Sequence, residues 1–286
     1  MNAAGIAPDA SLYSAPKIDC HCHILDPEGF GYAGDVSYRP AGQETGSAHY
    51  FAQVLDAYGV RHALLVGPNS GYGTDNRCLL AAIAGSRGRF KGIAVVPDDA
   101  STGYLQELKA QGIVGIAFNY ALHGLDYYRP AEALFARLAA LDMFVQVQVE
   151  QTQLHTLAPV LRACGAQLLI DHCGRPDVTQ GLDGDGFAAL LSLADTGRAT
   201  VKLSGFSKFS KEDFPFADAR PYAQALLGAF GADHCIWASD WPFLKAPKRL
   251  DYGPLLQLFG QMVPDAADRR KILWDTPGRL FGFAAP

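Results

Sequence analysis

Three histidines and one aspartate stand where apolar runs of the sequence end, and side chains of these types can carry catalysis. His21 and His23 lie two residues apart in IDCHCHI, while His172 and Asp240 close two later runs, IDHC and WASD. Clustered imidazole N–H groups can stabilise the negative charge that develops on a carbonyl oxygen as water adds to it. An aspartate within hydrogen-bond reach of that water can accept its proton. We therefore predict that these four residues are catalytic.

The alternation of side chains along a strand predicts which way the residues of the first run point. Residues two apart on an extended strand share a face, so we expect His21 and His23 to lie on one face with Asp19. Cys20 and Cys22 should then point the opposite way, toward the helices. The alternating Cys and His residues do not predict one shared metal cluster.

The same four side chains could instead hold a metal ion. His-x-His, a third histidine and an aspartate resemble a catalytic zinc site with an open coordination position. In that case the ligands of a single divalent ion would be His21, His23, His172 and Asp240, with Glu150 as another candidate.

These residues need elements that bring them together, and the sequence supplies eight of them. Eight short β-rich runs alternate with segments whose apolar residues have the spacing of an amphipathic helix. The predicted strands are residues 17–24, 62–67, 91–96, 112–119, 143–150, 167–173, 199–205 and 233–240. Strict alternation predicts a parallel sheet with helical crossovers, and eight is the number that closes into a (β/α)8 barrel.

A doubly wound open sheet is the alternative, but no Gly-x-Gly-x-x-Gly follows the first run, which weakens its dinucleotide-binding form. No linker or repeat divides the chain, so we expect one domain over residues 1–286, with residues 1–16 as a flexible N-terminal segment and a last helical stretch over 265–283.

Five motifs taken together resemble the amidohydrolase superfamily, and most closely its branch of pyrone-dicarboxylate lactonases. They are IDCHCHI near the start, GTDNR at 73–77, IDHCGRP at 170–176, VKLSG at 201–205 and SDWP at 239–242. The resemblance extends over almost the whole chain and implies a barrel hydrolase that opens a lactone with water. It implies that His21, His23 and His172 polarise the carbonyl and that Asp240 activates the water.

The resemblance also bears on the metal. Many members of the superfamily bind one or two metal ions through a carboxylated lysine or a histidine of the fourth or fifth strand. The fifth run here offers Gln146, Gln148 and Glu150 instead. Because the related pyrone lactonases work without metal, we expect no cofactor, with a single zinc ion as the alternative.

An anionic lactone needs cations at the mouth, because arginine pairs with carboxylate through two hydrogen bonds. The predicted substrate-binding residues are Arg175, then Lys208 and Arg129, with Asn69, Ser70, Tyr72 and Asn119 as hydrogen-bonding partners. His123 could also reach the pocket, whereas we expect Arg77 to hold a loop against its helix. Ala117 stands where relatives commonly have arginine, and Phe243–Leu244 follow the proline where a histidine is often found. The pocket should therefore be less cationic and more apolar than that of a pyrone-dicarboxylate hydrolase.

Three alternatives to the lactonase are weighed. A zinc-dependent decarboxylase of the same superfamily would need a histidine in the fifth strand, which is missing. A sugar-acid lactone isomerase would use nearly the same residues. A non-catalytic binding barrel would have no need for three imidazoles and a carboxylate at strand ends.

Composition limits the classes of partner. The 286 residues are 49% hydrophobic and 19% charged, with a net charge of −5 and no basic stripe, so nucleic acid is not an expected partner. The sequence shows neither a signal peptide nor a run long enough to span a membrane. Six scattered cysteines in a chain of this size predict free thiols and a cytoplasmic protein. The expected partner is a small anionic lactone, bound by a monomer or a homo-oligomer.

Overall fold

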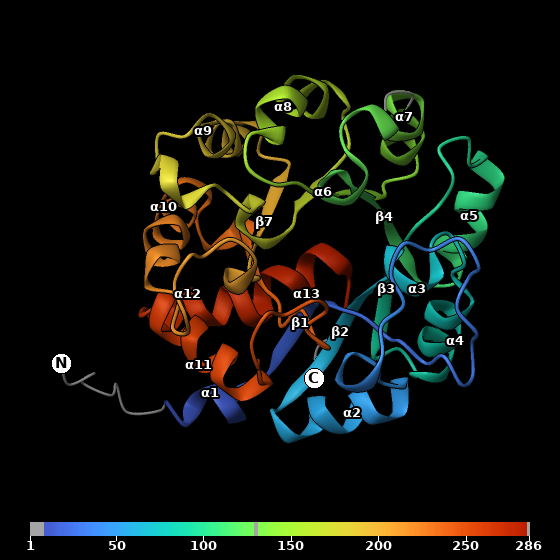
Figure 1. The fold of residues 1–286 in the computed structure, drawn as a ribbon, viewed down its shortest axis with the longest axis horizontal. Helices are drawn as coiled ribbons and strands as arrows, with labels where there is room; N and C mark the ends of the chain where they lie inside the picture. The colour runs from blue at the N-terminus through green and yellow to red at the C-terminus, as the bar shows by residue number, and fades with distance from the viewer. Residues whose placement is uncertain (1–8, 129–130, 285–286) are drawn as a thin grey trace.

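The computed structural model describes residues 9–128 and 131–284, and in this part of the chain eight parallel strands lie in sequence order. They are β1 Lys17–Cys22, β2 Val60–Val66, β3 Phe90–Ala94, β4 Ile113–Asn119, β5 Phe144–Gln148, β6 Leu168–Ile170, β7 Ala199–Leu203 and β8 Cys235–Trp237. Each strand pairs with the next, and helices surround the strands (Figure 1). The predicted (β/α)8 barrel is confirmed, and the doubly wound sheet is wrong.

The barrel closes at one end through the segment that follows β8. Cys22 forms a parallel bridge with Trp241, and the amide of His23 donates to the carbonyl of Trp241 at 2.8 Å. The amide of Asp240 donates to the carbonyl of His21 at 2.9 Å. Closure of the barrel therefore brings His21, His23 and Asp240 together.

The outer layer consists of helices whose apolar face covers the strands. They include α2 Ala48–Ala57, α4 Arg77–Gly85, α5 Thr102–Ala110, α7 Glu132–Ala140, α8 Gln153–Ala163, α9 Asp185–Ser192, α10 Arg220–Phe230 and α11 Tyr252–Met262, with shorter α1 Ser11–Ser14, α3 Asn69–Tyr72, α6 Tyr120–His123, α12 Ala266–Arg270 and α13 Thr276–Phe281. In α2, the Ser47 side chain caps the helix by accepting from the amide of Tyr50. Phe51 and Leu55, one turn apart, are both fully buried.

The interior of the barrel is a separate apolar core. Ile18 and Cys20 of β1 pack there with Leu64, Ile93 and other inward residues, and Phe281 of α13 joins them. Phe144 contacts the ring of Phe281, and Lys91 donates to the carbonyl of Phe281. Because this core fills the barrel from below, the space left for a ligand is at the carboxyl ends of the strands.

The predicted strands continue two or three residues too far at several of these ends. His172 and Asp240 follow β6 and β8 with φ values of +50° and +62°, a left-handed conformation that no strand contains. The mouth is built from these turns. Backbone held in this region by residues other than glycine is found most often at functional sites.

Part of the expected flexible segment, residues 1–8, lies outside the described residues. In the remainder, Ser11–Ser14 form α1, and Leu12 is buried against Gly260 of α11. All six cysteines are free, as predicted. None of the described helices has the length and apolar character that crossing a membrane requires.

Candidate active site

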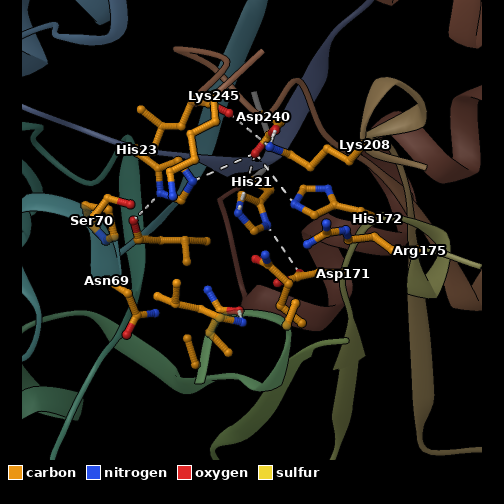
Figure 2. A pocket seen from close by; sticks show the side chains of 18 of the residues that line it. His21, His23, Asn69, Ser70, Asp171, His172, Arg175, Lys208, Asp240 and Lys245 are labelled. Atoms are coloured by element: carbon orange, nitrogen blue, oxygen red, sulfur yellow. Dashed lines mark hydrogen bonds and ion pairs between the residues drawn. The ribbon is translucent and has the colours of Figure 1, made fainter. Parts of the chain in front are cut away.

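A cavity of about 460 Å³ opens at the carboxyl ends of the strands, a volume that suits a small organic molecule. His21, His23, His172 and Asp240 all line it, and Figure 2 shows the three imidazoles directed toward the carboxylate. The four residues come from the ends of three strands that are far apart in sequence. The cavity is thus the place where the predicted catalytic residues meet.

A β-bulge in β1 explains how His21 reaches this cavity, and it corrects the expected alternation. Asp19 pairs with Ala63 but Cys22 pairs with Leu65, so β1 holds one extra residue between the two pairs. As a result, Cys20 points into the barrel core, not toward the helices, and His21 also faces inward.

Asp19 does not share the face of the histidines. Its carboxylate accepts from the Ser239 amide at 2.9 Å and from the Tyr252 hydroxyl of α11 at 2.8 Å. Burial raises its pKa. Because Ser239 immediately precedes Asp240, this buried carboxyl group positions the turn that carries Asp240.

The three imidazoles surround one oxygen of Asp240. The Nε2 atoms of His172, His23 and His21 lie 3.6, 3.8 and 3.9 Å from Asp240 Oδ1. These distances are too long for direct hydrogen bonds. They leave all four groups able to contact one small atom between them, such as a water oxygen or a carbonyl oxygen.

His23 is neutral and its tautomer is fixed. Its Nδ1 lies 2.8 Å from the carbonyl oxygen of Val66, which can only accept, so Nδ1 carries the proton. Burial lowers the pKa of His23 to about 4. Its Nε2 is therefore an unprotonated acceptor that faces Asp240.

His172 sits in a strained turn that the neighbouring strand makes possible. His172 and Cys173 both have positive φ, and His172 Nδ1 lies 3.1 Å from the Ser204 hydroxyl. A Cβ atom on Gly205 would lie 2.6 Å from the imidazole ring. Burial lowers the pKa of His172 well below its usual range, so this imidazole is also neutral.

Asp240 is ionised because a lysine stands beside it. Lys208 Nζ lies 2.9 Å from Asp240 Oδ2 and 3.3 Å from the carbonyl oxygen of Leu244. Burial alone would raise the pKa of Asp240, but the positive charge of Lys208 outweighs it and holds the pKa below its usual range. Oδ1, on the imidazole side, is left to contact a ligand.

Below His21 lies a buried polar network that the sequence analysis did not identify. Lys202 Nζ lies 2.9 Å from Asp171 Oδ1, 2.6 Å from Gln146 Oε1 and 3.1 Å from His21 Nδ1. Gln146 Nε2 donates to Asp171 Oδ2 at 3.0 Å. Burial would raise the pKa of Asp171, but Lys202 outweighs it and lowers that pKa. A lysine in the apolar run ATVKL was the one visible signal of this network.

The predicted substrate-binding residues are only partly assembled. Asn69, Ser70, Asn119, Arg175 and Lys208 line the cavity. Tyr72 does not: it is buried, and its hydroxyl accepts from the amide of Asp26. Arg129 lies outside the described residues.

Two further candidates do not line the cavity. His123 contacts a lining residue, with its Nε2 3.3 Å from Asn69 Oδ1. Arg77 is exposed and paired with Asp75. Asn76 instead holds this loop beside β3, because its side chain donates to the carbonyl of Val95 and accepts from the amide of Val95.

The cationic side chains at the mouth differ in whether a carboxylate of the protein pairs with them. Arg175 pairs with Glu150 at 3.0 Å and Lys208 with Asp240. Lys245 lines the cavity with its Nζ 4.5 Å from the ring centre of Tyr38, and no carboxylate in the described chain pairs with it. Lys245 could not be predicted from the sequence, because the loop that places it has no periodic pattern.

Apolar side chains cover the other wall of the cavity. Ala117 lies near the end of β4, Leu122 belongs to α6, and Phe243 and Leu244 belong to the loop after β8. The residues that predicted a more apolar pocket, Ala117, Phe243 and Leu244, therefore all line the cavity.

By residue type and distance, the cluster could hold a metal ion. One ligand atom each from His21, His23 and Asp240 lie within 4.8 Å of one another, and the same holds for His21, Asp171 and His172. Three such ligands with an open position are typical of catalytic zinc. The positive charges of two lysines disfavour a bound metal cation here, because Lys208 contacts Asp240 and Lys202 contacts His21.

Comparison with known proteins gives consistent matches along the chain. An amidohydrolase family model matches residues 18–283. The chain is 31% identical over 279 residues to the 4-sulfomuconolactone hydrolase of Hydrogenophaga intermedia, which covers 93% of this chain and 89% of that protein. It is 28% identical over 281 residues to the 2-pyrone-4,6-dicarboxylate hydrolase of Comamonas testosteroni, covering 93% and 90%.

A solved structure gives the same result in three dimensions. A probable 2-pyrone-4,6-dicarboxylic acid hydrolase from Acinetobacter baumannii, with citric acid bound, superposes with a TM-score of 0.84. It is 29% identical, and the match covers 93% of this chain and 99% of that one.

Proposed function

The chain belongs to the amidohydrolase family, and on that premise we propose that it hydrolyses the ring ester of a small anionic lactone. The relatives reported above include hydrolases of a sulfonated lactone and of a pyrone dicarboxylate. Both substrates are cyclic esters that carry anionic groups.

One observation carries the proposal: three imidazole Nε2 atoms and one ionised carboxylate oxygen surround a single small space at the floor of the cavity. Ester hydrolysis needs an acceptor for the proton of water and donors for the carbonyl oxygen. Asp240 Oδ1 supplies the acceptor, and imidazole N–H groups supply the donors.

In the proposed reaction, water lies between Asp240 and the unprotonated Nε2 of His23. Its oxygen attacks the carbonyl carbon, one proton passes to Asp240, and the electron pair of the C=O bond moves onto the carbonyl oxygen. His21 and His172 face that oxygen and stabilise its charge. When the adduct collapses, the ring C–O bond breaks and Asp240 returns the proton to the leaving ring oxygen.

His23 differs here from the role that the resemblance implied. A neutral imidazole with its proton on Nδ1 has no N–H to offer the carbonyl through Nε2. We assign it to holding the attacking water by accepting a hydrogen bond, and we assign carbonyl polarisation to His21 and His172.

We propose that this reaction proceeds without a metal ion. If a divalent ion were bound by His21, His23 and Asp240, it would supply Lewis-acid polarisation of the carbonyl. Lys208 already contacts Asp240, and Lys202 contacts His21. Like charges at these distances disfavour a dication at the same ligands.

The wall of the cavity suggests the kind of lactone. Lys245 is available for one anionic group of the substrate, with Arg175 beside Glu150 as a second contact. Asn69, Ser70 and Asn119 offer hydrogen bonds to ring oxygens. Phe243 and Leu244 favour an apolar ring edge. We therefore propose a lactone with one carboxylate or sulfonate over one with two carboxylates.

A panel of lactones tests this function. The purified protein is incubated with lactones that carry one carboxylate, one sulfonate, two carboxylates or a sugar-acid chain, and proton release is followed. The product is identified by NMR, because a lactone isomerase would shift the ring without net opening. Ring opening of a mono-anionic lactone supports the proposal, and failure to open every lactone of the panel contradicts it.

A further inference from the structure

Lys202 lies directly under His21 and is fully buried in the wall of the barrel. Its ammonium group carries three hydrogens and no acceptor. Three acceptor atoms lie within hydrogen-bond reach, one each from Asp171, Gln146 and His21. The ammonium therefore has three partners: an ion pair with Asp171 and hydrogen bonds to Gln146 and His21.

His21 Nδ1 has two neighbours: one favours a proton on this nitrogen, and the other favours its absence. Asp171 Oδ1, at 3.2 Å, could accept a hydrogen from it, whereas Lys202 Nζ, at 3.1 Å, can only donate one to it. If Nδ1 carried the proton, the third hydrogen of Lys202 would be buried without an acceptor, facing another N–H. Such an unsatisfied buried donor is costly, and more so when it is charged.

Asp171 does not need the histidine as a donor. Its Oδ1 forms an ion pair with Lys202, and its Oδ2 accepts from Gln146 Nε2 at 3.0 Å. Gln146 in turn receives Lys202 on its Oε1 at 2.6 Å. The network is complete when His21 Nδ1 is an acceptor, and then the proton of the neutral imidazole must be on Nε2.

We propose that Lys202 is a positioning residue that holds His21 in its Nε2–H tautomer, which makes His21 a donor to the substrate carbonyl and prevents it from coordinating a metal ion. The donor role rests on the proposed function; the tautomer and the effect on metal binding do not. His21 Nε2 is buried and has no hydrogen-bond partner within the described chain, so it is left to contact a ligand.

The arrangement is the inverse of an ordinary metal-binding histidine. A histidine that binds a metal through Nε2 usually donates its Nδ1–H to a carboxylate or a carbonyl oxygen. Asp171 is placed for that role, 3.2 Å from His21 Nδ1, but Lys202 Nζ contacts both Asp171 Oδ1 and His21 Nδ1 and competes for each. His23 has the metal-compatible arrangement, with Nδ1 on the carbonyl of Val66. Removal of Lys202 should convert His21 to the same type.

The wild-type protein gives the first test. Nitrogen NMR of the imidazoles, with His21 assigned through a His21→Gln variant, reports which ring nitrogen carries the proton. We expect a neutral ring protonated on Nε2. A His21 protonated on Nδ1, or on both nitrogens, overturns the proposal, and this measurement does not depend on any lysine variant being folded.

Lys202→Met gives the second test. The variant keeps a long side chain but removes the ion pair and both hydrogen bonds of Lys202, so His21 Nδ1 should donate to Asp171 and leave Nε2 free. We expect the NMR signature to move to Nδ1–H, and the zinc affinity measured by titration calorimetry to rise by about 10- to 100-fold, the range known for partners of metal-bound histidines. With a lactone that the panel shows to be opened, kcat should fall with little change in KM.

Lys17→Met is the matched control. Lys17, on β1, is also fully buried and also has three polar partners, but it donates to the carbonyl oxygens of Tyr13, Ala15 and Tyr58. It should change stability without changing the zinc affinity or the protonation of His21.

The outcomes separate the two proposals. Unchanged zinc affinity in Lys202→Met overturns the inference, and so does a higher affinity while the proton stays on Nε2, since removal of a positive charge would then be the whole effect. If the tautomer and the zinc result agree with expectation but no lactone is opened, the proposed function fails and the role of Lys202 stands.

Discussion

The backbone amide of Asp240 donates a hydrogen bond to the carbonyl of His21 at 2.9 Å, and the side chains of these two residues face each other across 3.9 Å. One residue follows the last strand, and the other belongs to the first. The hydrogen bond that closes the barrel at its mouth therefore also sets the distance between the proposed base and the proposed carbonyl donor.

Asp240→Asn should abolish turnover while the barrel stays folded. The amide has nearly the same volume but cannot accept the proton of water, so kcat should fall by about 10²- to 10⁴-fold. Asparagine tolerates the left-handed backbone of this position, where φ is +62°. Steady-state kinetics and circular dichroism check both statements. The control is Asp251→Asn, at an exposed ion pair with Arg249, and a rate as low as that of Asp240→Asn in this control would contradict the assignment.

Lys245→Met should weaken substrate binding more than chemistry. Lys245 is the lining cation without a carboxylate partner in the described chain, so its charge is available to the substrate. Loss of one charge-assisted contact should raise KM at least about tenfold with kcat within about twofold. Lys248→Met, at an exposed pair with Asp213, is the matched control. Equal KM values for the two variants would show that the anion binds elsewhere.

Removal of metal ions should leave turnover unchanged. Because Lys208 and Lys202 contact the residues that would hold an ion, we expect the rate after exhaustive dialysis against a chelator to stay within about twofold of the untreated rate. The metal content of both samples is measured in parallel. A rate that is lost on dialysis and restored by zinc would contradict the metal-free mechanism.

Gly205→Ala should displace His172. A Cβ atom there would lie 2.6 Å from the imidazole ring, and φ at this position is +63°. Gly197 has nearly the same φ, +62°, but its Cβ would have no neighbour within 4 Å. Both variants should lose about 1–2 kcal/mol from the backbone. Only Gly205→Ala should also lose activity, measured as kcat per folded protein, and full activity in it would remove His172 from the mechanism.

The free energy of unfolding should decrease as the pH is lowered, because His23 is held neutral in the folded protein. Its pKa in the folded protein is about 4, against 6.5 for an ordinary histidine. As the pH falls below 6.5, His23 becomes protonated in the unfolded chain but stays neutral in the folded protein. The stabilisation present above this pH is therefore progressively lost down to about pH 4. Between about pH 7.5 and about pH 5, this one residue should account for about 2 kcal/mol.

Urea unfolding at the two pH values, compared between wild type and His23→Asn, isolates that contribution. His172 acts in the same direction in both proteins and cancels in the comparison. If wild type and variant lose the same stability over this range, His23 is not held neutral by its surroundings.

Most of the scaffold could be predicted from the sequence because its signals are periodic. The eight apolar runs and the helices between them follow directly from side-chain spacing, and the ends of those runs indicated His21, His172 and Asp240. The extra residue in β1 left no such signal, so Asp19 and Cys20 were assigned to the wrong faces. A bulge changes the direction of side chains without changing the composition of the strand.

The contacts within the site were less predictable. The position of Tyr72 after the second strand predicts a place at the mouth, but a turn directs its side chain into the core, where its hydroxyl contacts Asp26. Lys245 reaches the cavity through a loop held by the contact of its own amide with Glu44, a residue distant in sequence. Such placements depend on tertiary contacts that local pattern does not encode.

The most direct test of lactone hydrolysis at Asp240 is the incorporation of labelled oxygen from isotopically labelled water. The protein is incubated with a mono-anionic lactone, and the product is analysed by mass spectrometry at times when uncatalysed opening is negligible. We predict one labelled oxygen in the new carboxylate of the opened acid for the wild type, and none above background for Asp240→Asn. A rearranged lactone without label, or equal labelling by the two proteins, would contradict the account.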